Sequence, residues 1–441
     1  MVFKYVVVAD DLTGANDTGV QFTRYGYQTY VIVSLKNLRR KVNLIRDIAD
    51  VVVFNTESRA DPPELAYQKC YDIAKIIKEI GAEIIYKKVD STMRGNIGSE
   101  IDGLMDGLDR KYAFFTSAFP LNKRIIIGGY LLVNGSPINL TPFSIDPISP
   151  VKEPNVLELI KKQSKRAIKL ISYDIVRHGV NSISSHVNRL LKELDEAIFV
   201  FDAVTHENLY NIAKATVKYT DKGIFSGSAG LARELPKALG GEIKELEIII
   251  QPKGKYFFVL SGSANPLTVE QVDIAVLTSD LYIIEINARG IIEDSEKEMK
   301  RVLDEFKKRS KENYVIGFRT VRSHKDLEES WELGRKIGLS KHEVSRRIAK
   351  FVGELARIVY DSVNGDVSGF LLTGGDIAIK VCEKLGIEAL EIIGEIDPGV
   401  PISRALSSKG NKDLLVITKA GGFGEKDTVS KSIDLVTKAR S

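Results

Sequence analysis

The amino-acid sequence predicts an α/β fold made of two domains, each with a mainly parallel β-sheet flanked by helices. Three observations lead to this prediction. Short apolar runs rich in β-branched and aromatic residues alternate with stretches of helical periodicity, as in parallel sheets that are covered on both faces. The chain has 441 residues, more than one ordinary core accommodates. A polar segment with proline and glycine, residues 251–255, separates two such series.

The first series defines a domain of residues 1–250. Its predicted strands are residues 5–9, 30–34, 51–55, 84–87, 113–117 and 197–201. Residues 63–80 carry apolar side chains at helical spacing, which predicts an amphipathic helix between two of these strands. The stretch 136–154 contains five prolines, and we expect it to form an extended excursion from this domain.

The second series defines a domain of residues 251–441. Its predicted strands are residues 256–260, 281–286, 315–318, 370–373 and 414–418. Residues 344–360 and 377–385 have helical periodicity, as does the stretch 294–311. Strands that alternate with helices in this way again favour a parallel sheet.

Composition and charge exclude several classes of protein. The net charge is only +4, from 63 basic and 59 acidic residues, which does not favour a nucleic-acid partner. Apolar runs stay well below the ~20 residues of a membrane span, and the short run after Met1 does not resemble a signal peptide. We therefore expect a cytoplasmic protein with no membrane partner. Cys70 and Cys382 stand far apart in the sequence, as expected of reduced structural thiols.

Two adjacent carboxylates follow the first predicted strand. Asp10 and Asp11 come directly after it, and Asn16 and Asp17 would lie on the first turns of the helix that follows. Ligands of open parallel sheets bind beyond the carboxyl ends of strands. Carboxylates there can accept hydrogen bonds from substrate hydroxyls, take a proton or hold a metal ion. A helix cap would explain one aspartate, but the adjacent pair beside Asp17 favours a functional site.

A polar loop follows the strand predicted at 84–87. It carries Asp90, Ser91, Thr92 and Arg94. An arginine can bind a carboxylate through two hydrogen bonds, and the hydroxyl groups add further donors. Arg59 follows the strand 51–55 and could supply a second cation at the same edge of the sheet. This loop suits a small carboxylated ligand, while an exposed polar loop without function is the alternative.

Three small-residue turns follow apolar strands of the second domain. They are SGSANP at 261–266, TGGD at 373–376 and KAGGFG at 419–424. Glycine lets backbone N–H groups approach phosphate oxygens, and a helix N-terminus adds favourable partial charge. One such turn would be explained as a tight turn, but three of them favour a phosphate site. The chain lacks the P-loop pattern and the strand-linked G-x-G-x-x-G pattern, so neither a P-loop enzyme nor a Rossmann dehydrogenase is predicted.

Eight short motifs occur in order along the chain. They are ADDLTGAND at 9–17, DSTMRGN at 90–96, FP at 119–120, GSAGLA at 227–232, SGS at 261–263, TGGD at 373–376, PGVP at 398–401 and TKAGGFG at 418–424. Together they resemble the four-carbon acid sugar kinase family, from about residue 5 to about residue 430. The stretches 294–311 and 321–341 carry no motif of that family.

The resemblance implies an ATP-dependent kinase that phosphorylates the terminal (C4) hydroxyl of a four-carbon sugar acid such as threonate, erythronate or 3-oxo-tetronate. The first domain would hold the acid and the second ATP, with the active site in the cleft between them. Domain closure would then bring the two ligands together and exclude water.

The motifs also imply site residues. The acid would be bound by Asp10, Asp11, Asp17, Arg59, Asp90, Ser91, Thr92 and Arg94. ATP would be bound by Ser261, Gly262, Ser263, Thr373, Gly374, Gly375, Asp376, Lys419, Gly421, Gly422 and Gly424. Arg94 would anchor the carboxylate of the substrate, and Asp11 is favoured over Asp10 as the base that takes the hydroxyl proton. Mg²⁺ would bind mainly through ATP, with Asp376 as the candidate protein ligand.

Several alternatives stay open at this point. A non-catalytic sugar-acid or nucleotide sensor could share the fold, and a kinase for a different small sugar acid could share the motifs. A dehydrogenase or aldolase acting on sugar acids is disfavoured by the missing dinucleotide pattern and the absence of an identifiable lysine nucleophile. The sequence leaves open the stereochemistry of the acid, the choice between Asp10 and Asp11, and whether the chain forms a homo-oligomer.

Overall fold

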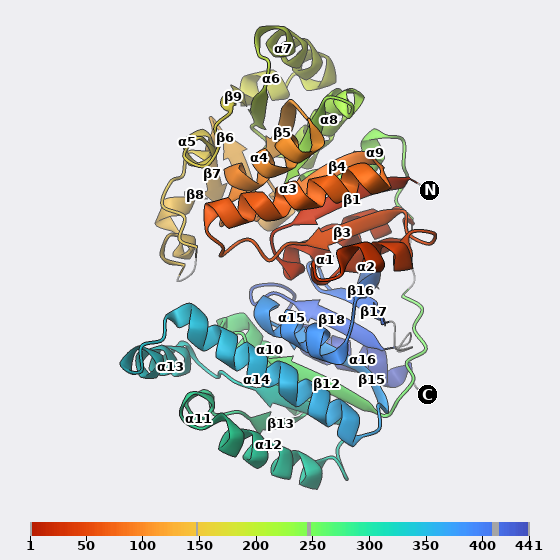
Figure 1. The fold of residues 1–441 in the computed structure, drawn as a ribbon, viewed down its shortest axis with the longest axis vertical. Helices are drawn as coiled ribbons and strands as arrows, with labels where there is room; N and C mark the ends of the chain where they lie inside the picture. The colour runs from red at the N-terminus through yellow and green to blue at the C-terminus, as the bar shows by residue number, and fades with distance from the viewer. Residues whose placement is uncertain (1, 147–148, 245–247, 408–413, 440–441) are drawn as a thin grey trace. The chain divides into compact units, whose positions relative to one another are not determined.

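The computed structural model describes residues 2–146, 149–244, 248–407 and 414–439. The chain divides into two compact units, Met1–Glu245 and Leu246–Ser441, whereas the sequence placed the division after residue 250. Each unit contains a mainly parallel sheet flanked by helices (Figure 1). This architecture confirms the predicted α/β fold class.

The main sheet of unit 1 consists of parallel strands in the order β2-β3-β1-β4-β11-β5-β10-β9. Their bounds are β1 Phe3–Ala9, β2 Thr29–Ile32, β3 Val51–Asn55, β4 Ala82–Lys88, β5 Tyr112–Thr116, β9 Ala167–Ile171, β10 Ala197–Phe201 and β11 Gly223–Gly227. Strands β3 and β5 are fully buried, and β1 is buried except at Lys4, which explains their near-continuous hydrophobic sequences. Strands β9 and β11 were not among the predicted ones.

Helices cover the sheet of unit 1. They are α1 Leu12–Thr23, α2 Leu38–Ile45, α3 Pro63–Ile80, α4 Ile97–Leu108, α5 Val156–Lys161, α6 Tyr173–Val176, α7 Gly179–Glu193, α8 His206–Thr216 and α9 Ala229–Ala238. The predicted helix at 63–80 is confirmed as α3, with proline at its start and Gly81 after its end. Helices α3 and α4 pack side by side (Figure 1), and α1 packs against α9.

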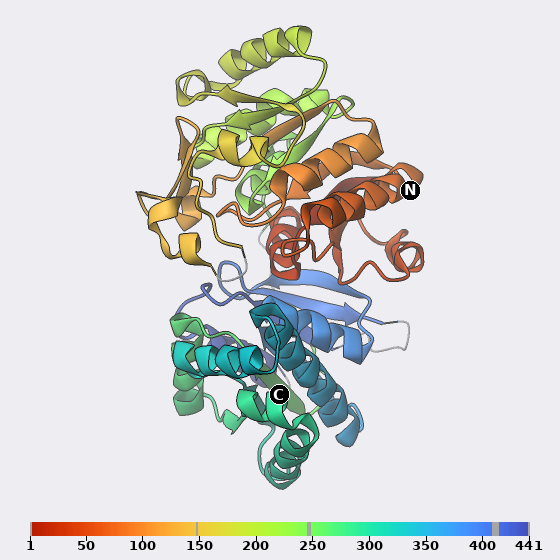
Figure 2. The ribbon, with the colours of Figure 1, turned by 60° about the vertical axis from the view of Figure 1, so that its left-hand side comes forward.

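A small antiparallel sheet projects from one end of unit 1 (Figure 2, orange to yellow). Its strands are β6 Arg124–Ile127, β7 Tyr130–Val133 and β8 Ser136–Pro137. Short 3₁₀ turns at Ile138–Leu140 and Pro142–Ile145 follow. The proline-rich stretch predicted as an extended excursion thus contains a short strand and two turns, and its residues 147 and 148 lie outside the described residues.

The sheet of unit 2 has the strand order β13-β14-β12-β15-β18-β17-β16. The bounds are β12 Tyr256–Ser261, β13 Tyr282–Glu285, β14 Val315–Arg319, β15 Val367–Thr373, β16 Ala389–Glu395, β17 Pro401–Leu406 and β18 Leu415–Lys419. The five strands from β13 to β18 in this order are parallel, while β17 runs antiparallel to both of its neighbours. The β16–β17 hairpin was not predicted.

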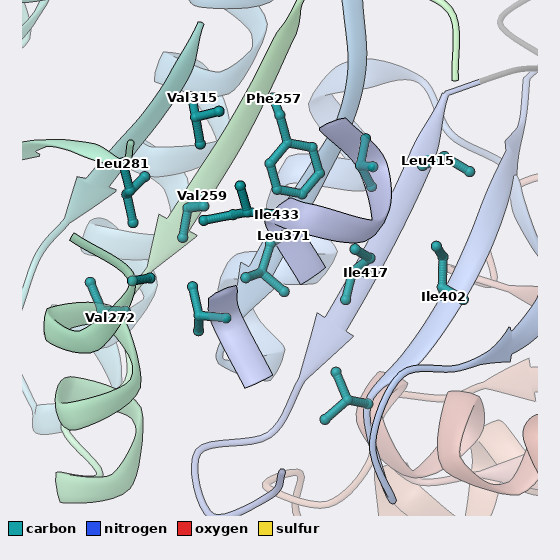
Figure 3. Packing of buried hydrophobic residues seen from close by; sticks show 14 of the residues in the cluster. Phe257, Val259, Val272, Leu281, Val315, Leu371, Ile402, Leu415, Ile417 and Ile433 are labelled. Atoms are coloured by element: carbon teal, nitrogen blue, oxygen red, sulfur yellow. The ribbon is translucent and has the colours of Figure 1, made fainter. Parts of the chain in front are cut away.

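Helices of unit 2 flank this sheet around an aliphatic core. They are α10 Pro266–Thr278, α11 Ala288–Glu293, α12 Ser295–Arg309, α13 His324–Lys336, α14 Lys341–Ser362, α15 Gly375–Leu385 and α16 Thr428–Lys438. Figure 3 shows side chains of β12, β15 and β18 packed against α10 and α16, with Phe257, Leu371 and Ile433 near the centre. This packing fixes the strand ends from which the turns at 261, 373 and 419 emerge.

Two further sequence-based expectations concern single residues and membranes. Cys70 and Cys382 are buried free thiols. No helix within the described ranges combines the length and the apolar character that crossing a membrane requires.

Candidate functional site

The predicted acid-binding segments of unit 1 meet at one edge of its sheet. Strands β3, β1 and β4 are neighbours and parallel, so their carboxyl ends place residues 10–11, 56–59 and 88–94 side by side. Backbone hydrogen bonds join two of these segments, because the N–H groups of Ser58 and Arg59 both donate to the carbonyl oxygen of Asp10. The sheet topology therefore creates the cluster that the sequence predicted.

Arg59 binds both aspartates of the first turn. Its Nε and Nη2 donate to the two carboxylate oxygens of Asp10 at 2.8 and 3.0 Å, and its Nη1 donates to Asp11 Oδ2 at 2.8 Å. The second oxygen of Asp11 accepts the N–H of Gly14 at 2.8 Å and caps α1. Asp10 is 1% exposed, whereas the Asp11 side chain is 24% exposed, so Asp11 is the one that a ligand can reach.

Arg94 is held by its own loop in a similar way. Its Nε and Nη2 donate to the two oxygens of Asp90 at 2.7 and 3.2 Å, and its Nη1 donates to Asp146 Oδ2 at 3.2 Å. Thr92 donates its hydroxyl to Asp90. Met93, between these residues, has a φ of 62°, a left-handed conformation that is strained for such a side chain. The loop thus holds Arg94 in a fixed orientation.

Cations surround Asp10 and Asp90 and favour the ionised forms of these two carboxyl groups. Burial acts to raise the pKa of Asp10, but Arg59 and Lys87 outweigh it and hold that pKa below its ordinary value. Burial likewise opposes ionisation of Asp90, yet Arg94 and Arg59 keep its pKa well below the usual range. Two carboxylates with lowered pKa values are suited to orienting cations, and less suited to taking a proton.

A buried ion pair lies behind the aspartates. Lys87 Nζ is 2.9 Å from Glu100 Oε2 of α4, with side chains 0% and 1% exposed. Ser58 donates its hydroxyl to the other oxygen of Glu100. Burial lowers the pKa of Lys87, but Glu100 outweighs this effect and raises it. Lys87 thereby places a positive charge near Asp10, and Glu100 holds that lysine in position.

Lys88 occupies the other face of β4. Successive residues of a strand point to opposite faces, so Lys88 projects toward α1 while Lys87 projects toward α4. A Cβ atom on Gly14 would stand 2.8 Å from Lys88 Nζ and 2.5 Å from Asp11 Oδ1. A side chain at position 14 would have to displace one of these two groups, which accounts for the glycine in the motif.

Besides Lys87 and Glu100, three residues near the cluster were absent from the predicted site. They are Lys88, Arg124 and Asp146. Lys88 could have been found from the sequence, because a lysine at the end of an otherwise buried strand is unusual. Arg124 begins β6, and the charges of Asp90 and Asp17 act on it. Asp146 belongs to the proline-rich stretch, and nothing local in the sequence links it to Arg94.

The remaining predicted residues of unit 1 lie at the margin of the cluster. Asp17 lies farther along α1, where its charge acts on Tyr86 and Arg124. Ser91 is partly exposed in the loop that begins at Asp90.

The three small-residue turns of unit 2 also meet at one sheet edge. Strands β12, β15 and β18 are adjacent and parallel. Thr373 donates its hydroxyl to Ser261 Oγ at 3.1 Å, the Gly262 N–H donates to the Thr373 carbonyl at 3.3 Å, and the Gly374 N–H donates to the Lys419 carbonyl at 3.2 Å. Gly374 has a φ of 96°, which favours glycine there. The turns therefore form one connected rim.

Two helices begin at this rim. Asn265 caps α10 by accepting the Leu267 N–H, and Pro266 occupies the first turn. Helix α15 starts at Gly375, and its cap residue Gly374 makes no side-chain bond to the first turn. The free N–H groups of such a start can bind anions. Asp376 lies exposed in the same first turn.

Lys419 stabilises the turn at 419–424 through hydrogen bonds of its ammonium group. Its ammonium donates to Thr268 Oγ1 at 2.9 Å and to the carbonyl oxygens of Ala420 and Gly421 at 3.0 and 3.2 Å. Burial lowers the pKa of Lys419 to about 8. The side chain was predicted to contact a ligand, but its donors are engaged by the turn that it stabilises.

A cavity of about 390 Å³ lies beside this rim in unit 2. It opens past the carboxyl ends of β13 and β14, between α11 and α13. Thr320, which lines it, donates its backbone N–H to the Ser261 carbonyl at 3.0 Å. Asn287 and Ser330 contribute further polar groups to its lining. The residues of this cavity come from segments without a recognised motif.

Metal ligands are sparse in both units. In the part of the chain that the structure describes, no group of three or more His, Cys, Asp or Glu side chains could hold a metal ion. A metal that enters through its own phosphate ligands needs only one or two carboxylates.

Two family models match successive parts of the chain. Residues 5–235 match the family model of a sugar-binding N-terminal domain, and residues 258–429 match that of a nucleotide-binding C-terminal domain. The crystal structure of protein HI1011 of Haemophilus influenzae has a TM-score of 0.71 at 24% identity and covers 97% of this chain and 98% of its own. This structural likeness shows that the fold is shared.

Two curated relatives are similar over nearly their whole length. The D-threonate kinase of Salmonella typhimurium is 33% identical over 98% of this chain and 97% of its own. The D-erythronate kinase of Heliobacterium modesticaldum is 30% identical over 98% of this chain and 97% of its own. Identities of 33% and 30% over 98% of this chain include many positions outside the eight motifs. The chain therefore belongs to the family of four-carbon acid sugar kinases.

Proposed function

We propose that this kinase transfers the γ-phosphoryl group of ATP to the terminal (C4) hydroxyl of a four-carbon sugar acid, with threonate, erythronate and 3-oxo-tetronate as the candidate substrates. Unit 1 would hold the acid, and unit 2 would hold ATP. The proposal rests on the two groups of residues at the carboxyl ends of parallel strands, the charged cluster of unit 1 and the rim of turns of unit 2. One is rich in carboxylates and guanidinium groups, and the other is rich in glycine turns and helix starts.

In unit 1, Asp11 is the candidate base. It is more exposed than Asp10, and its neighbour is fully engaged by Arg59. Asp11 would accept the proton of the C4 hydroxyl while the oxygen attacks the γ-phosphorus and ADP leaves. Asp10 would orient Arg59, and Arg94 would receive the carboxylate of the acid at the edge that Asp146 now occupies.

In unit 2, backbone N–H groups of the rim are the candidate phosphate ligands. Glycines 374, 375, 421, 422 and 424 allow close approach, and Ser261, Gly262 and Ser263 border them. Thr373 and Lys419 would hold the turns in place rather than contact phosphate, because their polar groups are already bonded within the rim. The cavity of about 390 Å³ has the size of a small-ligand site and would take the nucleoside.

Mg²⁺ would enter with ATP. The exposed carboxylate of Asp376 at the start of α15 fits a cation that keeps phosphate and water as its other ligands. When bound, the ion would offset negative charge on the phosphates. A cytoplasmic location, where ATP is abundant, and a homo-oligomeric state both stay predictions.

A coupled ADP-release assay with ATP and Mg²⁺ across four-carbon acids tests the proposal. We expect turnover with at least one of D-threonate, L-threonate, D-erythronate and 3-oxo-tetronate, and a phosphorylated acid as product by mass spectrometry. A parallel assay with nicotinamide cofactors should give no absorbance change. ADP release that is independent of every acid, or no release at all, would contradict the proposed function.

A further inference from the structure

Lys88 is a buried cation at the start of α1. The residue is 4% exposed at the end of β4. The ammonium and Asp11 Oδ1 lie on either side of the space above Gly14, at 2.8 and 2.5 Å from where a Cβ atom of that residue would stand. The ammonium therefore faces the same small region as the candidate base.

Lys88 differs from the neighbouring cations of unit 1. Arg59 is paired with Asp10 and Asp11, Arg94 with Asp90, and Lys87 with Glu100. Within the described residues, the ammonium of Lys88 has neither an ion-pair partner within 4 Å nor a hydrogen-bond acceptor.

Lys88 is nearly buried, and its charge helps to lower the pKa of Asp10 without forming an ion pair with it. Removing an ammonium group from water costs several kcal/mol unless other groups replace the lost hydration. The start of a helix carries partial positive charge, so α1 adds no compensation of its own. A side chain kept in this state is best explained by a ligand that completes its coordination.

We propose that Lys88 is a further catalytic residue, whose ammonium contacts the acceptor oxygen and then the phosphoryl group that is transferred to it. This inference rests on the proposed function. A substrate carboxylate bound at this position would lie close to Asp11 and Asp10 and would be repelled by them, whereas a hydroxyl can donate to Asp11 and accept from Lys88. The acid therefore lies with its hydroxyl end at Lys88 and its carboxylate toward Arg94.

The role in the reaction follows from charge. The proton of the C4 hydroxyl passes to Asp11, the new O–P bond forms, and the bond from the γ-phosphorus to the β–γ bridging oxygen breaks. Lys88 donates hydrogen bonds to oxygens on which negative charge gathers. A donor positioned in this way lowers the barrier more than it strengthens ground-state binding.

The test compares Lys88→Met and Lys88→Arg with Lys75→Met, which alters an exposed lysine of α3. Steady-state kinetics use the acid that the wild-type chain turns over fastest, and calorimetry measures binding of that acid without nucleotide. We expect kcat to fall about 100-fold or more in Lys88→Met, with the dissociation constant of the acid within about threefold of wild type. Lys88→Arg should recover part of kcat, and Lys75→Met should behave as wild type.

Thermal unfolding separates catalysis from folding. Because Lys88 makes no ion pair of its own, the melting temperature of Lys88→Met should stay close to that of wild type. An unchanged kcat would overturn the inference and leave the proposed function intact. A loss confined to acid binding, or a lowered melting temperature that accounts for lost activity, would also overturn it. If wild type fails to turn over any acid, the proposed function and this inference fall together.

Discussion

Arg59 makes the two adjacent aspartates chemically different. It binds both oxygens of Asp10 but only one oxygen of Asp11, whose other oxygen caps α1. The sequence could indicate that an arginine would lie at the same strand edge, but not which carboxylate it would bind, because the pairing depends on side chains 48 and 49 positions apart. This difference in pairing and exposure is why we propose Asp10 as a positioning residue and Asp11 as the base.

Replacement of each aspartate by asparagine separates these roles. Asp11→Asn should lower kcat by about 100-fold or more, because the side chain can still cap α1 but no longer takes a proton. Asp10→Asn should mainly reduce stability, by about 3 kcal/mol, because Arg59 would lose its buried counter-charge. Steady-state kinetics and urea unfolding measure the two effects. Near-normal turnover of both variants would exclude either aspartate as the base.

Asp10 also predicts a pH dependence of stability. Its folded-state pKa lies below the ordinary value of 3.8, so the charged form is favoured in the folded protein. The resulting stabilisation is complete above the unfolded pKa and is lost as the pH falls through the folded pKa. Melting temperatures of wild type should drop between about pH 5 and pH 3, and Asp10→Asn should drop less over that window.

At the scale of secondary structure, the two faces of β4 carry neighbouring lysines in different surroundings. Lys87 pairs with Glu100 of α4, while Lys88 points to the start of α1. Alternation along a strand makes this arrangement expected once the strand is known. Which lysine would be neutralised could not be read from the sequence, since Glu100 lies on a helix after the loop.

The Lys87–Glu100 pair should be a strong determinant of the stability of unit 1. Removal of one partner, in Lys87→Met or Glu100→Gln, leaves the other buried, and we expect a loss of about 3–5 kcal/mol in the free energy of unfolding. Lys87→Met/Glu100→Leu should lose less than the sum of the single losses. Urea denaturation followed by circular dichroism measures this.

The exposed pair of Arg39 and Glu79 is the matched control. Its side chains are 71% and 51% exposed, so Arg39→Met should change stability by less than about 1 kcal/mol. Single losses at Lys87 and Glu100 as small as that of the control would show that the buried pair does not hold β4 against α4.

Each strand predicted from hydrophobic periodicity corresponds to an observed strand, whereas most of the helices were not predicted individually. Two of the missed regions have a physical explanation. Strand β11, residues Gly223–Gly227, begins and ends with glycine and includes a serine, composition that reads as a turn although the strand lies inside the sheet. Strands β16 and β17 form an antiparallel hairpin, a departure from the alternation of strands and helices that guided the prediction. The long amphipathic helix α3 was predicted with its observed bounds.

Both units place their candidate ligand-binding groups at the carboxyl ends of parallel strands, but the groups differ in chemical type. In each unit, candidate ligand-binding groups follow adjacent parallel strands, as expected for open α/β sheets. Unit 1 gathers charged side chains there, and unit 2 gathers glycine turns and helix starts. The sequence revealed both sets as motifs, while the cavity beside Ser261 and the inward direction of Lys419 required the fold. Which unit takes which ligand stays a prediction.

Hydrogen–deuterium exchange on the intact chain tests that assignment. Bound ligands slow exchange where they order or contact backbone N–H groups. We expect the acid alone to protect the start of α1 and residues 90–96 in unit 1. ADP with Mg²⁺ alone should protect residues 261–265, 374–376 and 420–424 in unit 2.

Gly421→Ala is the control for this experiment. A Cβ atom at that position would come within 2.5 Å of Ser263 Oγ and 2.9 Å of Asn265 Cβ, so the turn would have to shift. The variant should lose protection by ADP in unit 2 and keep protection by the acid in unit 1, because the two effects arise in separately packed units. Protection of residues 90–96 by ADP alone, without a change at the three turns, would place the nucleotide in unit 1 and contradict the assignment.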